Sequence, residues 1–265
     1  MLTEPAQGLA PRRTFSVVWW PLLGLVVAVT GWWAVTAALE INPVVLPSPA
    51  EVSDGFGRYR EVLLSETWHT TQSTVLGFGL SVAVGVLIGV SIAAWRPVER
   101  MFSPLLVAFN AVPKVALAPL MLIWFGYGSA PILAMAFMVC FFPIVLSTAT
   151  GLTSTPVDLV DLARAMDASR SQIFRRVRLP AALPQIFVGL KVAMPLAVIG
   201  VVVGEMQYGE TGLGMIIVQT SGQGDTSTAF AAVTLLALVS IVLYYLLVLI
   251  ERLALPWVRA TTSVR

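Results

Sequence analysis

The sequence predicts an all-α membrane protein with six transmembrane helices and both termini in the cytoplasm. Of its 265 residues, 57% are hydrophobic and only 11% are charged, whereas soluble domains carry about 25% charged residues. Several apolar stretches exceed the length of about 18 residues that marks a membrane-spanning helix. Because six spans and their connections use up the chain, residues 1–265 are predicted to form a single transmembrane domain.

The six candidate spans follow one another with one long connection on each side of the membrane. The first span follows Arg12 and Arg13; with about 23 residues it exceeds the roughly 7–15-residue core of a signal peptide, so we expect it to be retained. Pro113 and Pro119 interrupt the third span, which predicts a kinked or broken helix. The predicted spans are 17–39, 70–94, 102–126, 128–150, 186–208 and 229–251.

The distribution of basic residues predicts the orientation of the spans. With the N-terminus in the cytoplasm, twelve arginines fall in cytoplasmic segments and only Arg58 and Arg60 fall outside. The predicted cytoplasmic parts are the tails 1–16 and 252–265 and the connection 151–185, and the predicted outer part is the amphipathic segment 40–69.

Small residues and a lone cysteine are expected to serve helix packing. The G-x-x-x-G pairs at 85/89 and 200/204 each place two glycines on one helix face, which allows close contact between helices. Cys140 lies within an apolar run and is expected to be a small buried hydrophobe. A single cysteine excludes an internal disulfide and a multi-cysteine metal site, and His69 is the only histidine.

The connection 151–185 carries signals for two short helices. Residues 155–158 (TPVD) supply an N-cap, a proline at the first helical position and an acid three residues after the cap. Residues 169–172 (SRSQ) form a second capping box. The helices are expected to break at Asp167-Ala168, and Pro180 and Pro184 are expected to end the second helix before the next span. An apolar stripe on the first helix is predicted from Leu159, Leu162, Ala163 and Met166.

Two interpretations of this connection follow from its residues. Its arginines alone are typical of a basic cytoplasmic loop that contacts anionic headgroups. A basic loop that only sets the membrane orientation needs neither two helix caps nor an apolar stripe. An exposed pair of amphipathic helices instead suits docking into a groove of another protein.

Residues 161–180 resemble the EAA loop of the inner-membrane permeases of binding-protein-dependent ABC importers. The family pattern is E-A-A, three residues, G, nine residues and I-x-L-P; the chain has D-L-A, the same two spacings around Asp167, and V-R-L-P. Leu162 and Asp167 depart from the pattern. If the break needs a positive φ, aspartate is among the non-glycine residues that tolerate it best.

Further segments resemble the nitrate/sulfonate/taurine (NitT/TauT) branch of these permeases. That branch also includes permeases for thiamine-pyrimidine precursors and riboflavin. The resemblance therefore leaves open a sulfonate-, taurine- or nitrate-like anion and a pyrimidine- or riboflavin-type vitamin precursor as the solute. The segments are 46–49 (LPSP), 113–120 (PKVALAPL), 124–126 (WFG), 204–205 (GE), 212–214 (GLG) and 230–232 (FAA).

The resemblance implies a type I ABC importer permease (MetI-like) fold in the bacterial cytoplasmic (inner) membrane, with the chain forming the translocation pathway. The implied partners are a second permease copy (a homodimer), two ATP-binding subunits, an extracytoplasmic binding protein and membrane lipids, and no nucleic acid. ATP and Mg²⁺ would lie on the partner subunits and this chain would bind no cofactor, because neither Lys114 nor Lys191 ends a P-loop motif.

The ATPase-coupling role would fall to residues 156–180. Leu159, Leu162, Ala163 and Met166 would provide apolar seating on the ATPase, and Ser169 would cap the second helix. Polar contacts would come from Asp161, Arg164 and Arg170. The full set of expected coupling residues is Leu159, Asp161, Leu162, Ala163, Arg164, Met166, Asp167, Ala168, Ser169, Arg170, Leu179 and Pro180.

Polar and ionisable residues within the spans are candidates for the translocation pathway, because they are costly in lipid. Lys114 either lines the pathway and attracts an anionic substrate, or extends to the cytoplasmic headgroups. Glu205 either belongs to an outer gate or faces the outer headgroups. Gln72 and Asn110 are further candidates.

The outer segment 40–69 begins a helix with a capping box at residues 48–51 (SPAE). Val52, Phe56, Tyr59 and Leu63 share one face of it. This helix either lies near the docking site of the binding protein or rests at the membrane interface.

Two other function classes fit less well. An intramembrane enzyme needs a nucleophile with a base, paired acids or metal ligands, but the chain has one histidine, one cysteine and no aspartate inside a predicted span. An ion-coupled secondary transporter would usually show inverted repeats and buried carboxylates, and the sequence has neither pattern.

Overall fold

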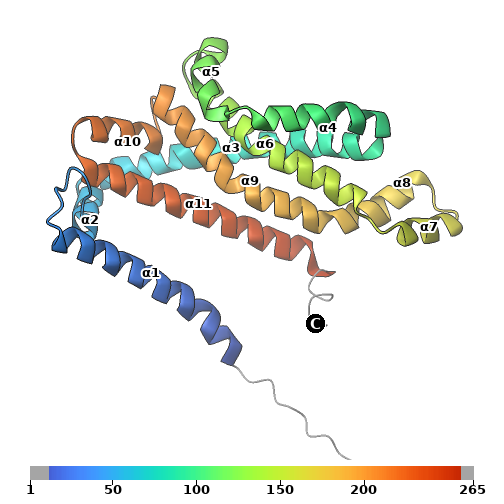
Figure 1. Ribbon diagram of the computed structural model, residues 1–265, viewed down its shortest axis with the longest axis horizontal. Coiled ribbons are helices and arrows are strands. Elements are labelled where there is room, and N and C mark those ends of the chain that lie inside the picture. The colour runs from blue at the N-terminus through green and yellow to red at the C-terminus, as the bar shows by residue number, and fades with distance from the viewer. Residues whose placement is uncertain (1–11, 258–265) are drawn as a thin grey trace, which may run out of the picture.

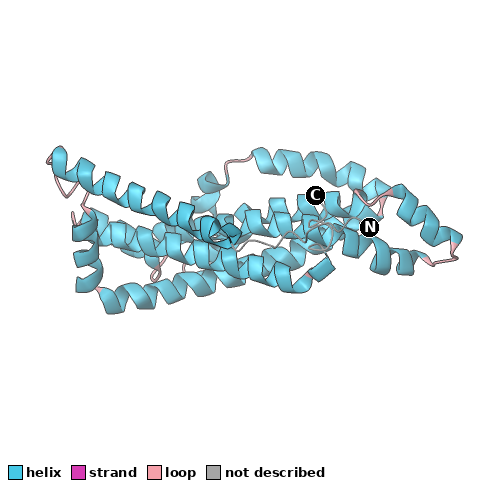
Figure 2. Cartoon of the chain, turned by 90° about the horizontal axis from the view of Figure 1, so that it is seen from below, coloured by secondary structure: helices cyan, strands magenta, loops and turns pink. Residues whose placement is uncertain are grey.

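The computed structural model describes residues 12–257, and this part of the chain contains helices and connections but no strand (Figure 2). Residues 1–11 and 258–265, which belong to the two expected cytoplasmic tails, lie outside the described residues. The elements in order are α1 (Arg12–Ala38), α2 (Pro49–Arg58), α3 (Arg60–Ala94), α4 (Arg96–Ala111), the 3-10 helix η1 (Lys114–Leu117), α5 (Ala118–Phe125), α6 (Ser129–Thr153), α7 (Val157–Ala165), α8 (Arg170–Ile173), the π-helical turn η2 (Phe174–Arg178), α9 (Leu179–Tyr208), α10 (Leu213–Gly222) and α11 (Thr226–Ala254).

Within residues 12–257, four helices are long and apolar enough to cross a membrane: α3, α6, α11 and the continuous helix Arg170–Tyr208. A fifth candidate is the bent pair Pro104–Ala111 and Lys114–Phe125, whose halves meet at 77°. Leu22–Ala38 in α1 is a shorter apolar helix. Each predicted span therefore coincides with helical structure, and the count of six spans stays a prediction.

The predicted break in the third span is confirmed. Val112, which precedes Pro113, has extended backbone (φ −69°, ψ 129°) and ends α4, as expected for a residue before proline. After the 3-10 turn, Pro119 lies in the first turn of α5, where the missing N–H costs no hydrogen bond. The two prolines thus divide one apolar stretch into two helices.

Helix α6 lies between α3 and α9 and forms the centre of the bundle (Figure 1). A Cβ added to Gly89 of α3 would lie 2.6 Å from Thr148 Cβ of α6. A Cβ on Gly200 of α9 would lie 2.7 Å from Ala136 Cα of the same helix. The other glycine of each G-x-x-x-G pair also contacts α6, so the predicted packing role of both motifs is confirmed.

Cys140 is fully buried in α6. Its Sγ lies 3.1 Å from Ser81 Oγ of α3 and 3.0 Å from the Ala136 carbonyl oxygen. The predicted role as a small buried side chain is therefore confirmed.

The outer amphipathic segment is divided in two by the structure. The capping box of Ser48 with Glu51 starts α2, as predicted. Tyr59 then leaves helical geometry (φ −120°, ψ 29°) and is the N-cap of α3. The residues predicted to share one helical face are therefore divided between α2 and α3. Val52 and Leu63 are buried, but Tyr59 is exposed.

Two sequence-based expectations for helix ends are wrong. The side chain of Thr155 does not cap α7, whose N-cap is Pro156 without a side-chain hydrogen bond; Thr155 Oγ1 instead donates to the Leu152 carbonyl at 3.5 Å. Pro180 and Pro184 do not end the second short helix, because α8 continues through η2 into α9. Pro180 lies in the first turn of α9, and the π-turn before it shifts the hydrogen-bonding register.

Candidate functional site

The α7–α8 turn projects from one end of the bundle, opposite the end that holds α2 and α10 (Figure 1). Val160 of α7 and Ile173 of α8 are buried. Leu159, Leu162 and Met166 are instead exposed, with Met166 at 75% relative exposure. This apolar stripe on α7 therefore faces away from the packed part of the chain.

The turn between α7 and α8 depends on the backbone of Asp167. Asp167 has φ +57°, and its N–H donates to the Arg164 carbonyl at 3.0 Å. The Ala168 N–H donates to the Ala163 carbonyl at 3.0 Å. These are the two hydrogen bonds of a Schellman motif, with Asp167 in the left-handed position that glycine usually occupies. The predicted break at Asp167-Ala168 and its positive φ are confirmed.

Helix α8 begins with the predicted capping box. The Gln172 N–H donates to Ser169 Oγ at 3.3 Å, and the Ser169 N–H donates to Gln172 Oε1 at 2.8 Å. Ser169 thus starts α8 two residues after Asp167, the left-handed residue that ends α7. The connection between the two helices is therefore short and hydrogen-bonded on both sides.

The surface of the turn carries both charges and a cavity. Arg164 Nη1 lies 2.9 Å from Asp161 Oδ1, and both side chains are more than half exposed. Exposed pairs of this kind contribute little to stability, so both groups remain available to a partner. The inner angle of the turn encloses about 310 Å³, lined by Ala163, Met166, Asp167, Ala168, Gln172, Ile173, Arg176 and Val177.

The structure brings most of the expected coupling residues together at this turn. Leu179 and Pro180 are the exceptions, since they lie in the first turn of α9 and are half-buried. Leu179 packs against the main apolar core. These two residues therefore join the turn to the bundle rather than extend its exposed surface.

The hydrogen bonds of the expected pathway residues do not join all of these residues into one site. Lys114 Nζ donates to Asn110 Oδ1 at 3.0 Å, where α4 ends and η1 begins. Gln72 is exposed on α3. Glu205 is buried in α9 at 2% relative exposure and bonds to residues of α3 and α10.

Glu205 belongs to a polar cluster that sequence reasoning missed in part. Thr70 Oγ1 of α3 donates to Glu205 Oε2 at 3.0 Å and accepts from the Leu213 N–H at 2.9 Å. Glu66, one helical turn before Thr70, accepts from the Gly212 N–H. The spacing of Glu66 and Thr70 on one face of a helix was a signal in the sequence, because residues i and i+4 are neighbours.

A second missed pair joins α9 to α11. Lys191 Nζ lies 2.8 Å from Glu251 Oε2, with side chains 23% and 21% exposed. Lys191 is an isolated charge within apolar sequence, and Glu251 lies next to Arg252 at the end of an apolar run. Charges in membrane helices generally pair with one another.

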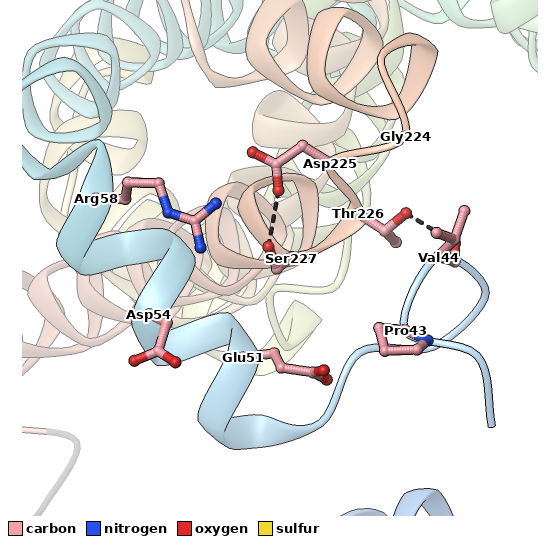
Figure 3. A pocket seen from close by; sticks show the side chains of 9 residues that line it. All are labelled: Pro43, Val44, Glu51, Asp54, Arg58, Gly224, Asp225, Thr226 and Ser227. Atoms are coloured by element: carbon pink, nitrogen blue, oxygen red, sulfur yellow. Dashed lines mark hydrogen bonds between the residues drawn. The ribbon is translucent and has the colours of Figure 1, made fainter. Parts of the chain in front are cut away.

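At the opposite end from α7 and α8, three acidic side chains and Arg58 surround a cavity of about 210 Å³ between α2 and the start of α11 (Figure 3). Burial raises the pKa of the Asp225 carboxyl, but hydrogen bonds from Thr228 and Ser227, with nearby Arg58, hold that pKa below its ordinary value. Thr226 Oγ1 donates to the Val44 carbonyl at 2.8 Å. This hydrogen bond ties the α1–α2 connection to α11.

Comparisons with known proteins agree with this architecture. The family model of the binding-protein-dependent transport system inner membrane component matches residues 82–260. The chain is 36% identical to the riboflavin transport system permease protein RibX of Chloroflexus aurantiacus, over 96% of this chain and 98% of RibX. It is 34% identical to the formylaminopyrimidine transport permease protein ThiX of Halalkalibacterium halodurans, over 85% of this chain and 90% of ThiX. Among solved structures, a chain of the MetNI methionine ABC transporter in an inward-facing conformation superposes with a TM-score of 0.61 at 22% identity, over 75% of this chain and 97% of that chain.

Proposed function

Because the chain belongs to the family of inner membrane components of binding-protein-dependent transport systems, we propose that it forms the translocation pathway of an ATP-driven importer. The family and the type I permease fold expected from the sequence are confirmed. The protein is a multi-pass inner-membrane transport component and not itself an enzyme. The family implies ATPase and binding-protein partners. The complete importer would contain two copies of this permease, two subunits that bind ATP and Mg²⁺, and one extracytoplasmic binding protein.

The proposed orientation places both termini and the α7–α8 turn in the cytoplasm, with α2 and α10 outside. The excess of arginines in the first set of segments supports it. Each ATP-binding subunit would then receive the exposed stripe of Leu159, Leu162 and Met166 in a groove. Arg164 and Asp161 would exchange part of their mutual contact for polar groups of that subunit.

The observation that best supports coupling is the exposed turn at the end of one continuous helix. Arg170–Tyr208 runs for 39 residues without interruption, which corresponds to about 58 Å at 1.5 Å per residue. Its α9 part packs on both α6 and α3. A displacement of the turn by closing ATPase subunits would therefore be carried into the centre of the bundle as motion of a packed rigid element.

The transported solute is proposed to be a heterocycle of the vitamin-precursor type. RibX and ThiX, named for riboflavin and formylaminopyrimidine transport, are similar to this chain over most of their length. Lys114, the residue that favoured an anion, donates to Asn110 within its own chain, so its charge does not by itself require an anionic solute.

The coupling role is tested by Arg164→Glu in the complex reconstituted with its ATP-binding subunits and binding protein. Reversal of this charge should place two acids side by side on α7 and reduce binding-protein-stimulated ATP hydrolysis about tenfold, the equivalent of 1.4 kcal/mol. Arg252→Glu, an equal charge change at the exposed end of α11, is the matched control and should retain stimulation. Normal stimulation in R164E would refute the assignment.

The solute class is tested on the binding protein, which meets the solute first. Its thermal unfolding should shift upward with riboflavin or a formylaminopyrimidine, because a ligand that binds only the folded state stabilises it. Taurine serves as the small anionic comparison. A shift with taurine and none with either heterocycle would contradict the proposal.

A further inference from the structure

A cavity of about 220 Å³ lies between α10 and the starts of α3 and α11, at the end of the bundle that holds α2 and α10 (Figure 1). Among its lining residues, Leu63 of α3 and Ile216 of α10 are buried and belong to the main apolar core. Tyr59, Gln219 and Gln223 also line the cavity but are exposed. The cavity thus combines an apolar inner wall with a few polar groups, which is the usual form of a small-molecule site.

The walls of this cavity are held in place by the fold. Helix α10 packs against α9 and α11. Its C-terminal end is closed by the Asp225 N–H, which donates to the Thr220 carbonyl at 2.9 Å. The Asp225 carboxylate accepts from the N–H and the hydroxyl of Thr228, which fixes the start of α11. Small-molecule sites are usually largely preformed, and a ligand would enter this cavity without a rearrangement of α10.

Two carboxamides on α10 are available to a ligand. Gln219 and Gln223 are four residues apart and are therefore neighbours on one helical face. Among the described residues, neither carboxamide nor the Tyr59 hydroxyl has a hydrogen-bond partner. The hydroxyls of Thr220 and Thr228 are instead already bonded within the chain. Each free carboxamide offers two N–H donors and an acceptor oxygen.

The charge of the cavity disfavours an anionic ligand. Its lining contains the carboxylate of Asp225 but no lysine, arginine or histidine among the described residues. Arg58, whose charge acts on Asp225, lines the neighbouring cavity of Figure 3 instead. A sulfonate or a nitrate would therefore meet a like charge, whereas the free carboxamides suit a neutral ligand that both donates and accepts hydrogen bonds.

A substituted aminopyrimidine matches these groups. An amino group beside a ring nitrogen presents a donor next to an acceptor, and a glutamine carboxamide pairs with that pattern through two hydrogen bonds. Aromatic side chains such as Tyr59 stack on flat heterocycles. The volume of about 220 Å³ is below the roughly 300–1,000 Å³ of pockets that hold drug-sized ligands, so a single ring fits better than the three fused rings of riboflavin.

We propose that this cavity is a solute-binding site for a single-ring aminopyrimidine, in which Gln219 and Gln223 pair with the polar edge of the ring and Tyr59 stacks on its face. This proposal rests on the function and the orientation proposed above, and it narrows the heterocyclic solute to the pyrimidine class. Tyr59 is the N-cap of α3, Gln223 is the C-cap of α10 and Thr228 lies in the first turn of α11. The site would therefore lie at the outer surface, where it could receive solute from the binding protein.

The site is tested by saturation-transfer NMR on the intact permease in lipid nanodiscs, with 4-aminopyrimidine as the probe. Gln219→Leu keeps the approximate volume of the side chain but removes the carboxamide, and it should weaken binding about tenfold because one pair of hydrogen bonds is lost. Gln185→Leu, the same change at an exposed glutamine of α9 outside the cavity, is the matched control and should bind as the wild type does. Equal affinities of Q219L and the wild type, or no binding by the wild type, would overturn the site.

The chemistry of the site is tested at Tyr59 and with two other ligands. Tyr59→Phe keeps the ring and should retain the affinity for 4-aminopyrimidine, whereas Tyr59→Leu should lower it about tenfold. Equal affinities of these two variants would contradict stacking on Tyr59. Riboflavin and taurine should both bind more weakly than 4-aminopyrimidine. Tighter binding of either ligand that is lost in Q219L would overturn the pyrimidine class.

The failure of this proposal can be distinguished from failure of the proposed function. The binding experiment uses the permease alone and needs neither ATP nor the binding protein. If the complete complex hydrolyses ATP in response to its binding protein but the permease does not bind 4-aminopyrimidine, the site is refuted and the importer stands. If binding depends on Gln219 but the complex shows no such hydrolysis, the cavity is a pyrimidine site and its role in import is refuted.

Discussion

Asp167 occupies the position at which this chain departs most clearly from the glycine of the EAA pattern. Its φ of +57° and the two bonds around it show why glycine is expected there, because the residue after the cap of a Schellman motif is left-handed. Aspartate adopts that region more readily than most side chains. The sequence therefore predicts the break correctly, and only the hydrogen bonds explain its form.

Asp167→Gly should keep the fold of the α7–α8 turn and raise its stability by about 1 kcal/mol, because it removes the cost of a left-handed non-glycine residue. Asp158→Gly is the matched control, since Asp158 lies in the first turn of α7 and glycine in a helix costs roughly 0.5–1 kcal/mol. Hydrogen exchange of the α7 amides measures both changes. A loss of protection in D167G as large as that in D158G would contradict this account of Asp167.

At the scale of the element, helix starts in the chain can be predicted where a side chain caps its own helix. Ser48 and Ser169 both form the capping boxes that their sequences indicate. The end of the second short helix could not be predicted in this way. Proline disturbs a helix where the missing N–H would have made an i→i−4 hydrogen bond, and whether Pro180 stands at such a position depends on the helical register before it. The π-turn Phe174–Arg178 before Pro180 removes that requirement, and no local pattern marks it.

Helix α11 depends on the carboxylate of Asp225 at its N-cap, which accepts from the Thr228 N–H and from the hydroxyls of Ser227 and Thr228. Asp225→Ala should lower the free energy of unfolding by about 1 kcal/mol near neutral pH. The pKa of this carboxyl is lowered in the folded protein, so its contribution is present above the ordinary pKa and is lost as the pH falls through the lowered pKa.

The difference between wild type and D225A should accordingly shrink below about pH 4. Unfolding of the detergent-solubilised permease, followed by circular dichroism across pH, measures this difference. A gap between the two proteins that stays constant, or widens, on acidification would show that the ionised cap does not stabilise α11.

At the scale of the whole molecule, the sequence predicts the features that depend on neighbouring residues but not the contacts between residues far apart in the chain. Apolar length and basic residues predict the helices and the coupling turn, because both are properties of neighbouring residues. The Glu205–Thr70 bond spans 135 residues and the Lys191–Glu251 pair spans 60. A single sequence contains no signal for which distant polar residues meet, so the Glu205–Thr70 bond and the α9–α11 ion pair required the structure.

The packing of α3, α6 and α9 yields a final prediction, because glycines set the spacing between these helices. In Gly200→Ala the new methyl would lie 2.7 Å from Ala136 Cα and 2.9 Å from the Met135 carbonyl oxygen. Both are atoms of the α6 backbone, so the helices must separate, and overpacking of this kind costs about 1–3 kcal/mol. Gly79→Ala is the matched control on α3, since nothing lies within 4 Å of its added Cβ; there alanine should stabilise the helix by roughly 0.5–1 kcal/mol. Denaturant titrations of the purified permease should thus move in opposite directions for the two variants, and a G200A protein as stable as G79A would mean that α6 and α9 are not held in close contact.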